Sequence, residues 1–260
     1  MDLKNLLYEK KGNVAVITFN RPDKLNALSS ELLRELIGLF HEMETDDEVR
    51  CVIITGNGRA FSAGGDISEE KKKDTLQGYD FVELFTRMGE AIERFKAPVI
   101  AALNGYCLGG GLEVAMCCDI RVAADNARLG SPELGLGLLP GAGGTTRLPR
   151  IIGMSRARLW IYTCEKYSAE QCYDLGVVDR IFPADTLMDE AMALAEKIAG
   201  QAPLAVKYAK ILTYDGLQTD LQRAIRMEGA MAAHLFSTAD KNEACSAFLE
   251  KREHKPFVGR

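Results

Sequence analysis

Short apolar runs mark the strands that this chain is expected to form. Residues 14–19, 51–55 and 98–103 are runs rich in Val, Ile and Ala, and turn residues follow the first two at 20–23 and 56–58. Runs of this length, bounded by turn signals, are typical of strands buried on both faces. They alternate with segments of helical periodicity, which predicts an α/β fold with a largely parallel sheet.

Helical spacing occurs between these runs and again through the last part of the chain. Ser29 and Ser30 can cap a helix, since the apolar residues after them recur every three or four positions: Leu32, Leu33, Leu36, Ile37, Phe40 and Met43. Another helical stretch covers residues 81–95, and beyond about residue 184 the pattern is helical only. We expect a core over residues 1–199 and a helical region over residues 200–260 that packs against the core or a neighbouring subunit.

Two glycine-rich loops share one design, in which a strand ends, glycines follow and a helix begins. They are AGGD at residues 63–66 and GGGLE at residues 109–113. In parallel α/β proteins such loops lie at the carboxyl ends of strands, and glycine lets a ligand approach the main chain closely. One N–H group from each loop would form an oxyanion hole, in which each donor contributes about 10²- to 10³-fold in rate. Tight packing turns are the simpler explanation for either loop alone.

Two glutamates accompany glycine-rich stretches in apolar surroundings. Glu113 follows the three glycines, and Glu133 lies between Pro132 and the stretch LGLGLLPGAGG. A buried carboxylate costs several kcal/mol unless it is paired, hydrogen-bonded or protonated. Each glutamate alone is explained by ordinary hydrogen bonding or exposure, whereas the pair is typical of general acid–base chemistry.

Composition and charge narrow the classes of function. The formal net charge is −5 with dispersed basic residues, so no nucleic-acid surface is expected, and the charged run at residues 69–74 is interpreted as a solvated helix face. Seven cysteines without a C-x-x-C pair favour free thiols over disulfides or a zinc site, and no metal is expected. The amino terminus lacks the apolar core of a signal peptide, and no run of 18 apolar residues occurs, which predicts a cytoplasmic protein away from membranes.

These motifs together resemble the crotonase superfamily, and most closely its enoyl-CoA hydratases. The resemblance runs nearly end to end and is carried by RPDKLNAL at 21–28, FSAGGDI at 61–67, PVIAALNGYCLGGGLEVAMCCDIRVA at 98–123, SPELGLGLLPGAGGTTRL at 131–148 and AFLEKREHKPF at 247–257. It implies a spiral of repeated β-β-α units with a C-terminal helical region that forms trimers, often as dimers of trimers. CoA would be part of the substrate, with no separate cofactor.

The resemblance also implies roles for individual residues. The N–H groups of Gly65 and Gly110 would hold the thioester oxygen, while Glu113 would activate water for attack at C3 and Glu133 would protonate C2. Burial should raise the pKa of Glu133, and a helix N-terminus near Glu113 should favour its ionised form. The residues implied in substrate and CoA binding are Lys24, Leu25, Ala27, Ala63, Gly64, Asp66, Ile67 and Lys251.

Three departures from the family pattern remove no group that hydration requires. Gly65 stands where alanine is common, which should hardly matter for a main-chain donor. Ser131 stands where hydratases often carry glutamine, which would change the hydrogen bonding around Glu133. Asp23 directly follows Arg21-Pro22, where some hydratases have a lysine for CoA, and Lys24 comes one place later.

The sequence is also compatible with other activities of the same superfamily and with binding functions that involve no catalysis. Enoyl-CoA isomerases generally lack a counterpart of Glu113, which favours hydration, but a dienoyl, cyclic or otherwise specialised thioester stays possible at this stage. A non-catalytic acyl-CoA binder would not need both glutamates, and an RNA binder should show a basic stripe. The segment 67–88 is expected to shape the acyl pocket, whereas chain length, direction of reaction and pathway cannot be derived from these residues. Fatty-acid β-oxidation is the pathway that the resemblance suggests.

Overall fold

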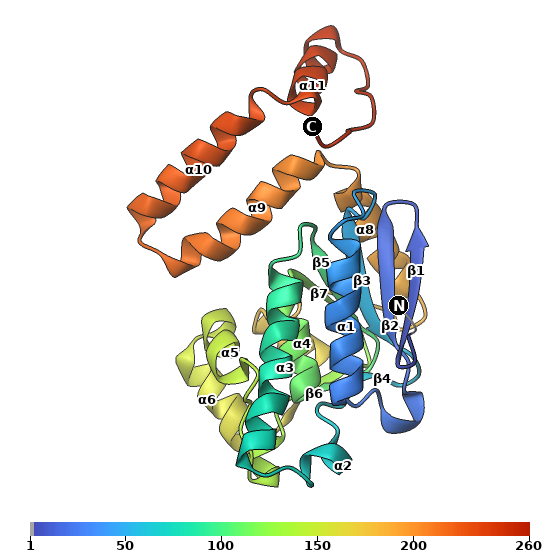
Figure 1. The fold of residues 1–260 in the computed structure, drawn as a ribbon, viewed down its shortest axis with the longest axis vertical. Helices are drawn as coiled ribbons and strands as arrows, with labels where there is room; N and C mark the ends of the chain where they lie inside the picture. The colour runs from blue at the N-terminus through green and yellow to red at the C-terminus, as the bar shows by residue number, and fades with distance from the viewer. Residues whose placement is uncertain (1–2) are drawn as a thin grey trace.

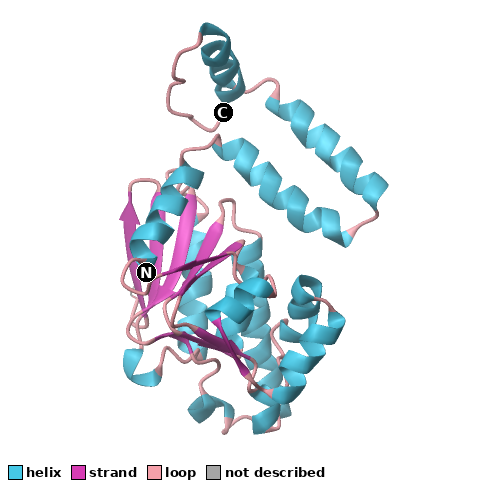
Figure 2. Ribbon diagram, turned by 180° about the vertical axis from the view of Figure 1, so that it is seen from behind, coloured by secondary structure: helices cyan, strands magenta, loops and turns pink. Residues whose placement is uncertain are grey.

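The chain folds into two β-sheets surrounded by helices, with a helical arm at the C-terminal end (Figure 1). The computed structural model describes residues 3–260. Figure 2 shows the sheets from behind, with the arm extending away from the layered body. This is the α/β architecture that the alternation of strands and helices predicts.

The larger sheet contains the strands that the apolar runs predict. Its order is β1-β2-β3-β5-β7-β10, and every neighbouring pair except β1 with β2 is parallel. Parallel strands covered on both faces are apolar throughout, and β3 and β5 are buried at every position. The strands span β1 Leu6–Lys11, β2 Val14–Phe19, β3 Cys51–Gly56, β5 Val99–Leu103, β7 Ile120–Ala124 and β10 Arg180–Phe182.

A smaller sheet of short strands lies beside the first. It has the order β4-β6-β8-β9, with β4 Ala60–Ser62, β6 Tyr106–Leu108, β8 Arg128–Gly130 and β9 Lys166–Ser168. In sequence, β3, β5 and β7 of the large sheet are each followed by a strand of the small sheet and then by a helix. This is the expected spiral of β-β-α units. The two glycine loops therefore leave β4 and β6, and not the longer strands as the apolar runs suggested.

Helices cover both faces of the large sheet. Helix α8 packs on one face through Leu187, Ala191 and Ala195, while α1, α3 and α4 belong to the cluster on the other face. Helix α1 begins as predicted, since the Ser29 hydroxyl accepts a hydrogen bond from the N–H of Leu32. The helices are α1 Ser30–Met43, α2 Ile67–Glu70, α3 Thr75–Glu93, α4 Gly110–Cys117, α5 Gly144–Ile152, α6 Met154–Thr163, α7 Ala169–Asp174, α8 Leu187–Ala199, α9 Pro203–Asp215, α10 Leu221–Leu235 and α11 Ala239–Glu250, with short 3-10 helices η1 Pro22–Lys24, η2 Glu133–Leu136 and η3 Gly216–Gln218.

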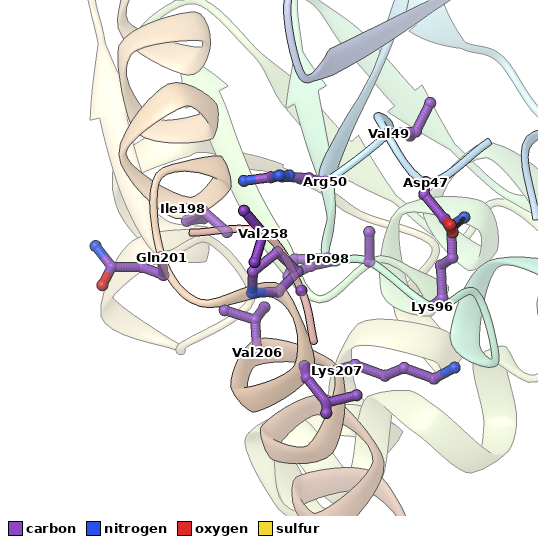
Figure 3. Close-up of a pocket in the computed structure, with 14 residues that line it drawn as sticks. Asp47, Val49, Arg50, Lys96, Pro98, Ile198, Gln201, Val206, Lys207 and Val258 are labelled. Atoms are coloured by element: carbon purple, nitrogen blue, oxygen red, sulfur yellow. Dashed lines mark hydrogen bonds and ion pairs between the residues drawn. The ribbon is translucent and has the colours of Figure 1, made fainter. Parts of the chain in front are cut away.

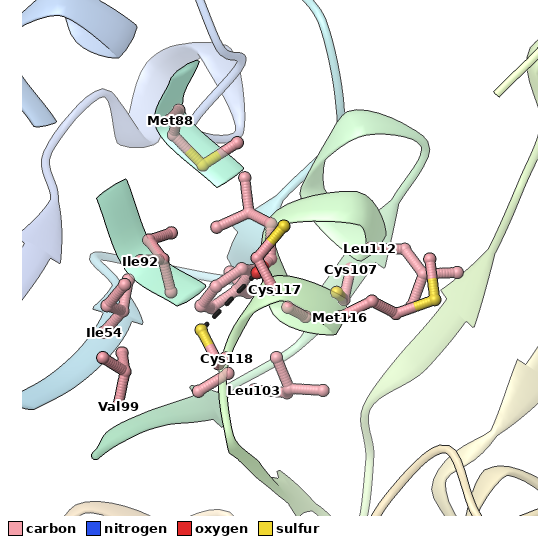
Figure 4. Packing of buried hydrophobic residues seen from close by; sticks show 14 of the residues in the cluster. Ile54, Met88, Ile92, Val99, Leu103, Cys107, Leu112, Met116, Cys117 and Cys118 are labelled. Atoms are coloured by element: carbon pink, nitrogen blue, oxygen red, sulfur yellow. Dashed lines mark hydrogen bonds between the residues drawn. The ribbon is translucent and has the colours of Figure 1, made fainter. Parts of the chain in front are cut away.

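Helix α4 is buried over its whole length. Figure 4 shows Leu112, Met116, Cys117 and Cys118 in the core with Met88 of α3. All seven cysteines are free thiols, as expected, and burial raises the pKa of the Cys117 thiol to about 12. A helix that is apolar all round makes any carboxylate it carries exceptional.

The C-terminal arm consists of α9, α10 and α11 and is tied to the body by a buried lysine. The Lys210 ammonium of α9 donates to the carbonyl oxygens of Ile92 and Ala97 and to Asp119 at 2.8 Å. Residues 200–260 contain helices and no strand, as the sequence predicts. The division into a core that ends at residue 199 and a helical region that begins at residue 200 stays a prediction. Within residues 3–260, no helix has both the length and the apolar character that a membrane crossing requires.

Candidate active site

The two glycine loops meet at the carboxyl ends of neighbouring parallel strands. Strands β4 and β6 pair in parallel with Ser62 opposite Cys107, so the loops that follow them run side by side. Gly64 and Gly109 have φ angles of +104° and +52°, which only glycine adopts readily. A β-carbon on Gly110 would lie 3.4 Å from the nitrogen of Gly65. The structure therefore brings together the two main chains that the sequence paired.

The N–H groups of Gly65 and Gly110 are left for a ligand. Gly110 is the first residue of α4, where helix geometry provides no acceptor for the N–H group. The loop at Gly65 is fixed through its neighbours, because Leu28 donates to the Gly64 carbonyl and Asp66 donates to the Leu28 carbonyl. Among residues 3–260, none of the hydrogen bonds that hold these loops uses either N–H group. The arrangement is that of an oxyanion hole.

Glu113 lies on the first turn of α4 and is only 4% exposed. Its Oε1 accepts hydrogen bonds from the N–H groups of Ala142 at 2.8 Å and Gly144 at 2.7 Å. Gly144 begins helix α5, so a helix N-terminus does face this carboxylate. Burial outweighs these bonds and raises the pKa of Glu113, although the N–H groups of Gly144 and Ala142 oppose that rise and favour the ionised form, as expected of a helix N-terminus. No hydrogen bond reaches Oε2 within the described chain.

Glu133 begins the 3-10 helix η2 and points at the same loops. Its Oε1 lies 3.2 Å from the position that a β-carbon on Gly109 would occupy. Both carboxyl oxygens are buried and have no hydrogen-bond partner among the described residues. Burial, followed by the nearby Glu113 and Glu70 carboxylates, raises its pKa to about 7, as predicted. An unpartnered carboxyl of this kind is suited to proton transfer near neutral pH.

A cavity of about 410 Å³ joins these groups. Its size lies within the range of small-molecule sites. The segment 67–88 supplies much of its wall, as expected, and a second apolar wall comes from residues 136–142. The apolar side chains that line the cavity are Ile67, Phe81, Val82, Phe85, Leu136, Leu138 and Leu139.

A third carboxyl, that of Glu70, lines the same cavity and was missed from the sequence. Its Oε1 lies 1.8 Å from the place that a β-carbon on Gly65 would take, so it packs directly against this loop. Burial and the neighbouring Asp66 and Glu69 carboxylates raise the pKa of Glu70. The charged run at 69–74 is therefore not simply a solvated face. The missing side chain of Gly65 leaves the space that the end of the Glu70 side chain occupies.

The segment 24–28 lies against the first glycine loop, as the predicted CoA contacts require. The N–H of Ala63 donates to the Leu25 carbonyl at 2.9 Å, and Gly64 accepts from Leu28. Leu25 has a φ angle of +50° at the end of η1, and Lys24 just before it is exposed. Of these residues, Ala63 and Gly64 line the cavity, whereas Lys24, Leu25 and Ala27 are not part of its lining.

The remaining predicted binding residues have different environments. Ile67 lines the cavity. The Asp66 carboxylate caps α2 through Ser68 and pairs with Arg21 at 2.9 Å, which makes it a support of the loop. Lys251 follows α11 at the end of the arm, and Figure 1 shows α11 far from α2 of the same chain, whose residues Ile67 and Glu70 line the cavity.

A second cavity, of about 190 Å³, opens at the base of the arm (Figure 3). Its lining residues Arg50 and Pro98 directly precede β3 and β5, so it lies at the amino ends of the strands. The Lys96 ammonium there is already held by the carbonyls of Glu44 and Asp46. Ligands of parallel α/β sheets bind at the opposite, carboxyl ends, which favours the glycine-loop cavity as the active site.

Two free main-chain N–H groups and two buried carboxyls around one cavity define an enzyme that stabilises an oxyanion and transfers protons. The chain belongs to the enoyl-CoA hydratase/isomerase family, whose model matches residues 9–257. It is 44% identical to a short-chain enoyl-CoA hydratase of Clostridium acetobutylicum, with full coverage of both chains. It is 38% identical to a 2,3-dehydroadipyl-CoA hydratase of Escherichia coli, over 99% of this chain and 100% of the relative.

Solved structures agree with this assignment. An enoyl-CoA hydratase from Bacillus anthracis superimposes with a TM-score of 0.96 at 38% identity, covering 99% of this chain and 100% of that one. An enoyl-CoA hydratase from Geobacillus kaustophilus gives 0.95 at 37% identity, with full coverage of both chains. The crotonase fold expected from the motifs is therefore confirmed.

Proposed function

We propose that the protein is an enoyl-CoA hydratase that adds water reversibly across the C2=C3 bond of a short-chain 2-enoyl-CoA. The observation that carries the proposal is the placement of Glu113 and Glu133 on one cavity with the N–H groups of Gly65 and Gly110. Each of these groups matches one requirement of the reaction: a base, an acid and an oxyanion hole.

The reaction begins with water held between the two glutamates. Oε1 of Glu113 is occupied by Ala142 and Gly144, so Oε2 is the atom that accepts the proton of water. The water oxygen forms a bond to C3 of the substrate, and the π electrons of C2=C3 move toward the thioester oxygen. Gly65 and Gly110 stabilise the resulting enolate through their N–H groups.

Glu133 completes the addition by delivering a proton to C2. A carboxyl with a pKa of about 7 is substantially protonated at neutral pH, and its proton is not engaged by another side chain. The proton that Glu113 took from water restores Glu133 through solvent or the next water molecule. The product is a 3-hydroxyacyl-CoA, and the reverse sequence is dehydration.

The acyl group lies in the apolar part of the cavity in this proposal. Phe81 and Phe85 are buried and line the apolar part of the cavity, and its volume of about 410 Å³ leaves room for an acyl chain. Lys24, Leu25 and Ala27 would contact the adenine end of CoA from the rim. These contacts are supported by the position of residues 24–27 beside the first glycine loop.

We also propose that the arm assembles the protein into a trimer or a dimer of trimers. Large apolar side chains on the arm are widely exposed, as is usual at protein interfaces: Leu217, Leu221, Phe236, Phe248 and Leu249. Such an assembly is the route by which Lys251 would reach CoA phosphates in a neighbouring subunit. Light scattering that gives a monomer mass would contradict it.

The proposed setting is fatty-acid β-oxidation in the cytoplasm, which cell fractionation and growth of a deletion strain on short fatty acids would test. The activity itself is tested by mixing purified protein with crotonyl-CoA and following product mass. A gain of one water per substrate supports hydration. An unchanged mass with a shifted double bond would identify an isomerase, and tight binding without turnover would identify a non-catalytic acyl-CoA binder. Cyclic and dienoyl thioesters tested alongside decide whether the acyl group is specialised.

A further inference from the structure

A chain of polar contacts connects the C-terminal arm to the active-site carboxylate Glu113. Its centre is Arg147 of α5, whose Nε and Nη2 donate to the two oxygens of Glu93 at 2.7 and 3.0 Å. The same guanidinium donates through Nη1 to the carbonyl of Ala142 at 3.0 Å. The N–H of Ala142 in turn donates to Glu113. One residue thus lies between the guanidinium and the carboxylate.

The chain contacts the arm at its other end. Tyr214, in the last turn of α9, donates its hydroxyl to Glu93 at 3.1 Å. Its ring also lies 4.7 Å from the guanidinium of Arg94, which pairs with Asp215 at 2.7 Å. Glu93 therefore receives hydrogen bonds from both α5 and α9. Its side chain is only 9% exposed, so these bonds are formed largely out of contact with water.

The surrounding glycines are arranged to admit this guanidinium. A β-carbon on Gly143 would lie 1.8 Å from Nη1 of Arg147, and one on Gly89 would lie 3.2 Å from Nη2. Gly143 also has a φ angle of +105°, which holds the turn that presents Ala142 and Gly144 to Glu113. The loop that orients Glu113 is thus built around the Arg147 side chain.

We propose that Arg147 is a positioning residue for Glu113, and that Tyr214 makes this positioning depend on how helix α9 sits on the core. The inference rests on the role assigned to Glu113 in the proposed function. A planar guanidinium with five donors holds Glu93 and the Ala142 carbonyl at fixed angles, which a lysine cannot reproduce. Misplacement of a reacting group by about 1 Å costs up to roughly 10²-fold in rate.

The positive charge of Arg147 supports the role of Glu113 as a base, in addition to the hydrogen bonds that position it. The charged and titratable groups around Glu113 are Arg147 on α5, Glu133 on η2 and Cys117 on α4. Burial raises the pKa of Glu113 overall, and of these neighbouring groups Arg147 opposes that rise, which favours the ionised form that activates water. Removing the charge should move the acid limb of the activity profile to higher pH.

The test compares Arg147→Met and Arg147→Lys in hydration of crotonyl-CoA. We expect Arg147→Met to lower kcat about 10- to 100-fold with KM changed less than about threefold, and to move the acid limb to higher pH. Arg147→Lys keeps the charge, so its limb should move less while kcat still falls. The matched control is Arg150→Met, since Arg150 is exposed on the same helix and donates only to its own turn.

A gentler variant tests the part played by the arm. Tyr214→Phe removes one hydroxyl and should lower kcat about two- to fivefold without changing the thermal midpoint appreciably. Tyr208→Phe is the matched control, because Tyr208 lies on the same helix and its hydroxyl contacts His234 of α10 instead. An unchanged kcat in Tyr214→Phe would refute the dependence on α9.

An Arg147→Met variant with the kcat of wild type would refute the role of Arg147. A variant whose activity falls only as much as its folded fraction falls, with the pH profile of wild type, would refute it as well. Wild-type turnover is measured first, so an inactive wild type refutes the hydratase assignment instead. In that case, infrared difference spectra of the carboxyl stretch during a pH titration still test whether Arg147 affects the ionisation of Glu113. Glu113 must ionise at higher pH in Arg147→Met, with Glu113→Gln identifying its band.

Discussion

Replacing Glu133 with glutamine should make the protein more stable at alkaline pH while it destroys activity. The carboxyl oxygens are buried without partners, and its pKa lies near 7. At pH 8 the folded protein must therefore hold an ionised carboxylate in surroundings that disfavour charge. Glutamine has nearly the same shape and never ionises.

The size of the effect follows from the difference in pKa between the folded and the unfolded chain. A rise from 4.5 to about 7 corresponds to an upper limit of about 3 kcal/mol, since each pKa unit is about 1.4 kcal/mol. The cavity opens to solvent, which screens the carboxylate, so we expect about 1–2 kcal/mol. Because the folded pKa is the higher one, the wild type matches the variant below pH 4.5 and loses stability as pH rises through 7.

The assay is urea unfolding of Glu133→Gln and wild type at pH 5 and pH 8, at one protein concentration because assembly contributes to stability. The variant should be more stable by about 1–2 kcal/mol at pH 8 and by much less at pH 5. Equal stabilities at both pH values, or a variant that is less stable than wild type at pH 8, would show that Glu133 is not a desolvated carboxyl.

Three further predictions concern the base, the oxyanion loop and the arm. Glu113→Gln should lower kcat about 10²-fold or more with its two main-chain hydrogen bonds retained; near-normal turnover in steady-state assays would contradict its role. Gly65→Ala should leave kcat/KM nearly unchanged, because the group in the way is the carboxyl end of the flexible Glu70 side chain and the N–H donor of residue 65 is kept; a large loss of kcat/KM in steady-state assays would show that Glu70 cannot move aside. Lys210→Met removes the cation that neutralises Asp119, which keeps only its hydrogen bond from the N–H of Val99, and should cost about 2–4 kcal/mol in urea unfolding; an unchanged midpoint would show that the arm is held by other contacts.

The parts of the fold that were predictable are those with continuous apolar runs. Strands β2, β3 and β5 coincide with such runs because both faces of the large sheet are covered, and α1 begins at the predicted serine cap. Strand β1 was not predicted, because five of its six residues are exposed at the sheet edge. Strands β4 and β6 have three residues each beside turn residues, too few to establish a period.

The candidate site was predictable where a side chain or a glycine carries the chemistry. Glu113, Glu133, Gly65 and Gly110 stand out in apolar or glycine-rich surroundings, and the structure brings all four together. The donors to Glu113 could not be found, because main-chain N–H groups have no sequence signature and Ala142 lies 29 residues away.

Glu70 was hidden for a different reason. It belongs to a charged run, and such runs are typical of solvent-exposed helix faces. However, Ile67 and Glu70 lie three residues apart on one face of α2, and both line the cavity. That spacing, directly after a glycine loop, is the signal that could have identified it.

The central claim is that two carboxyls on one cavity add water to an enoyl thioester. The most direct test is the absorbance of the enoyl-thioester band when crotonyl-CoA is mixed with wild type, Glu113→Gln and Glu133→Gln, with binding of crotonyl-CoA to each measured separately. We expect rapid loss of the band with wild type and losses at least about 10²-fold slower with both variants, while binding persists. A stable band with wild type, or a fast loss with either variant, would contradict it.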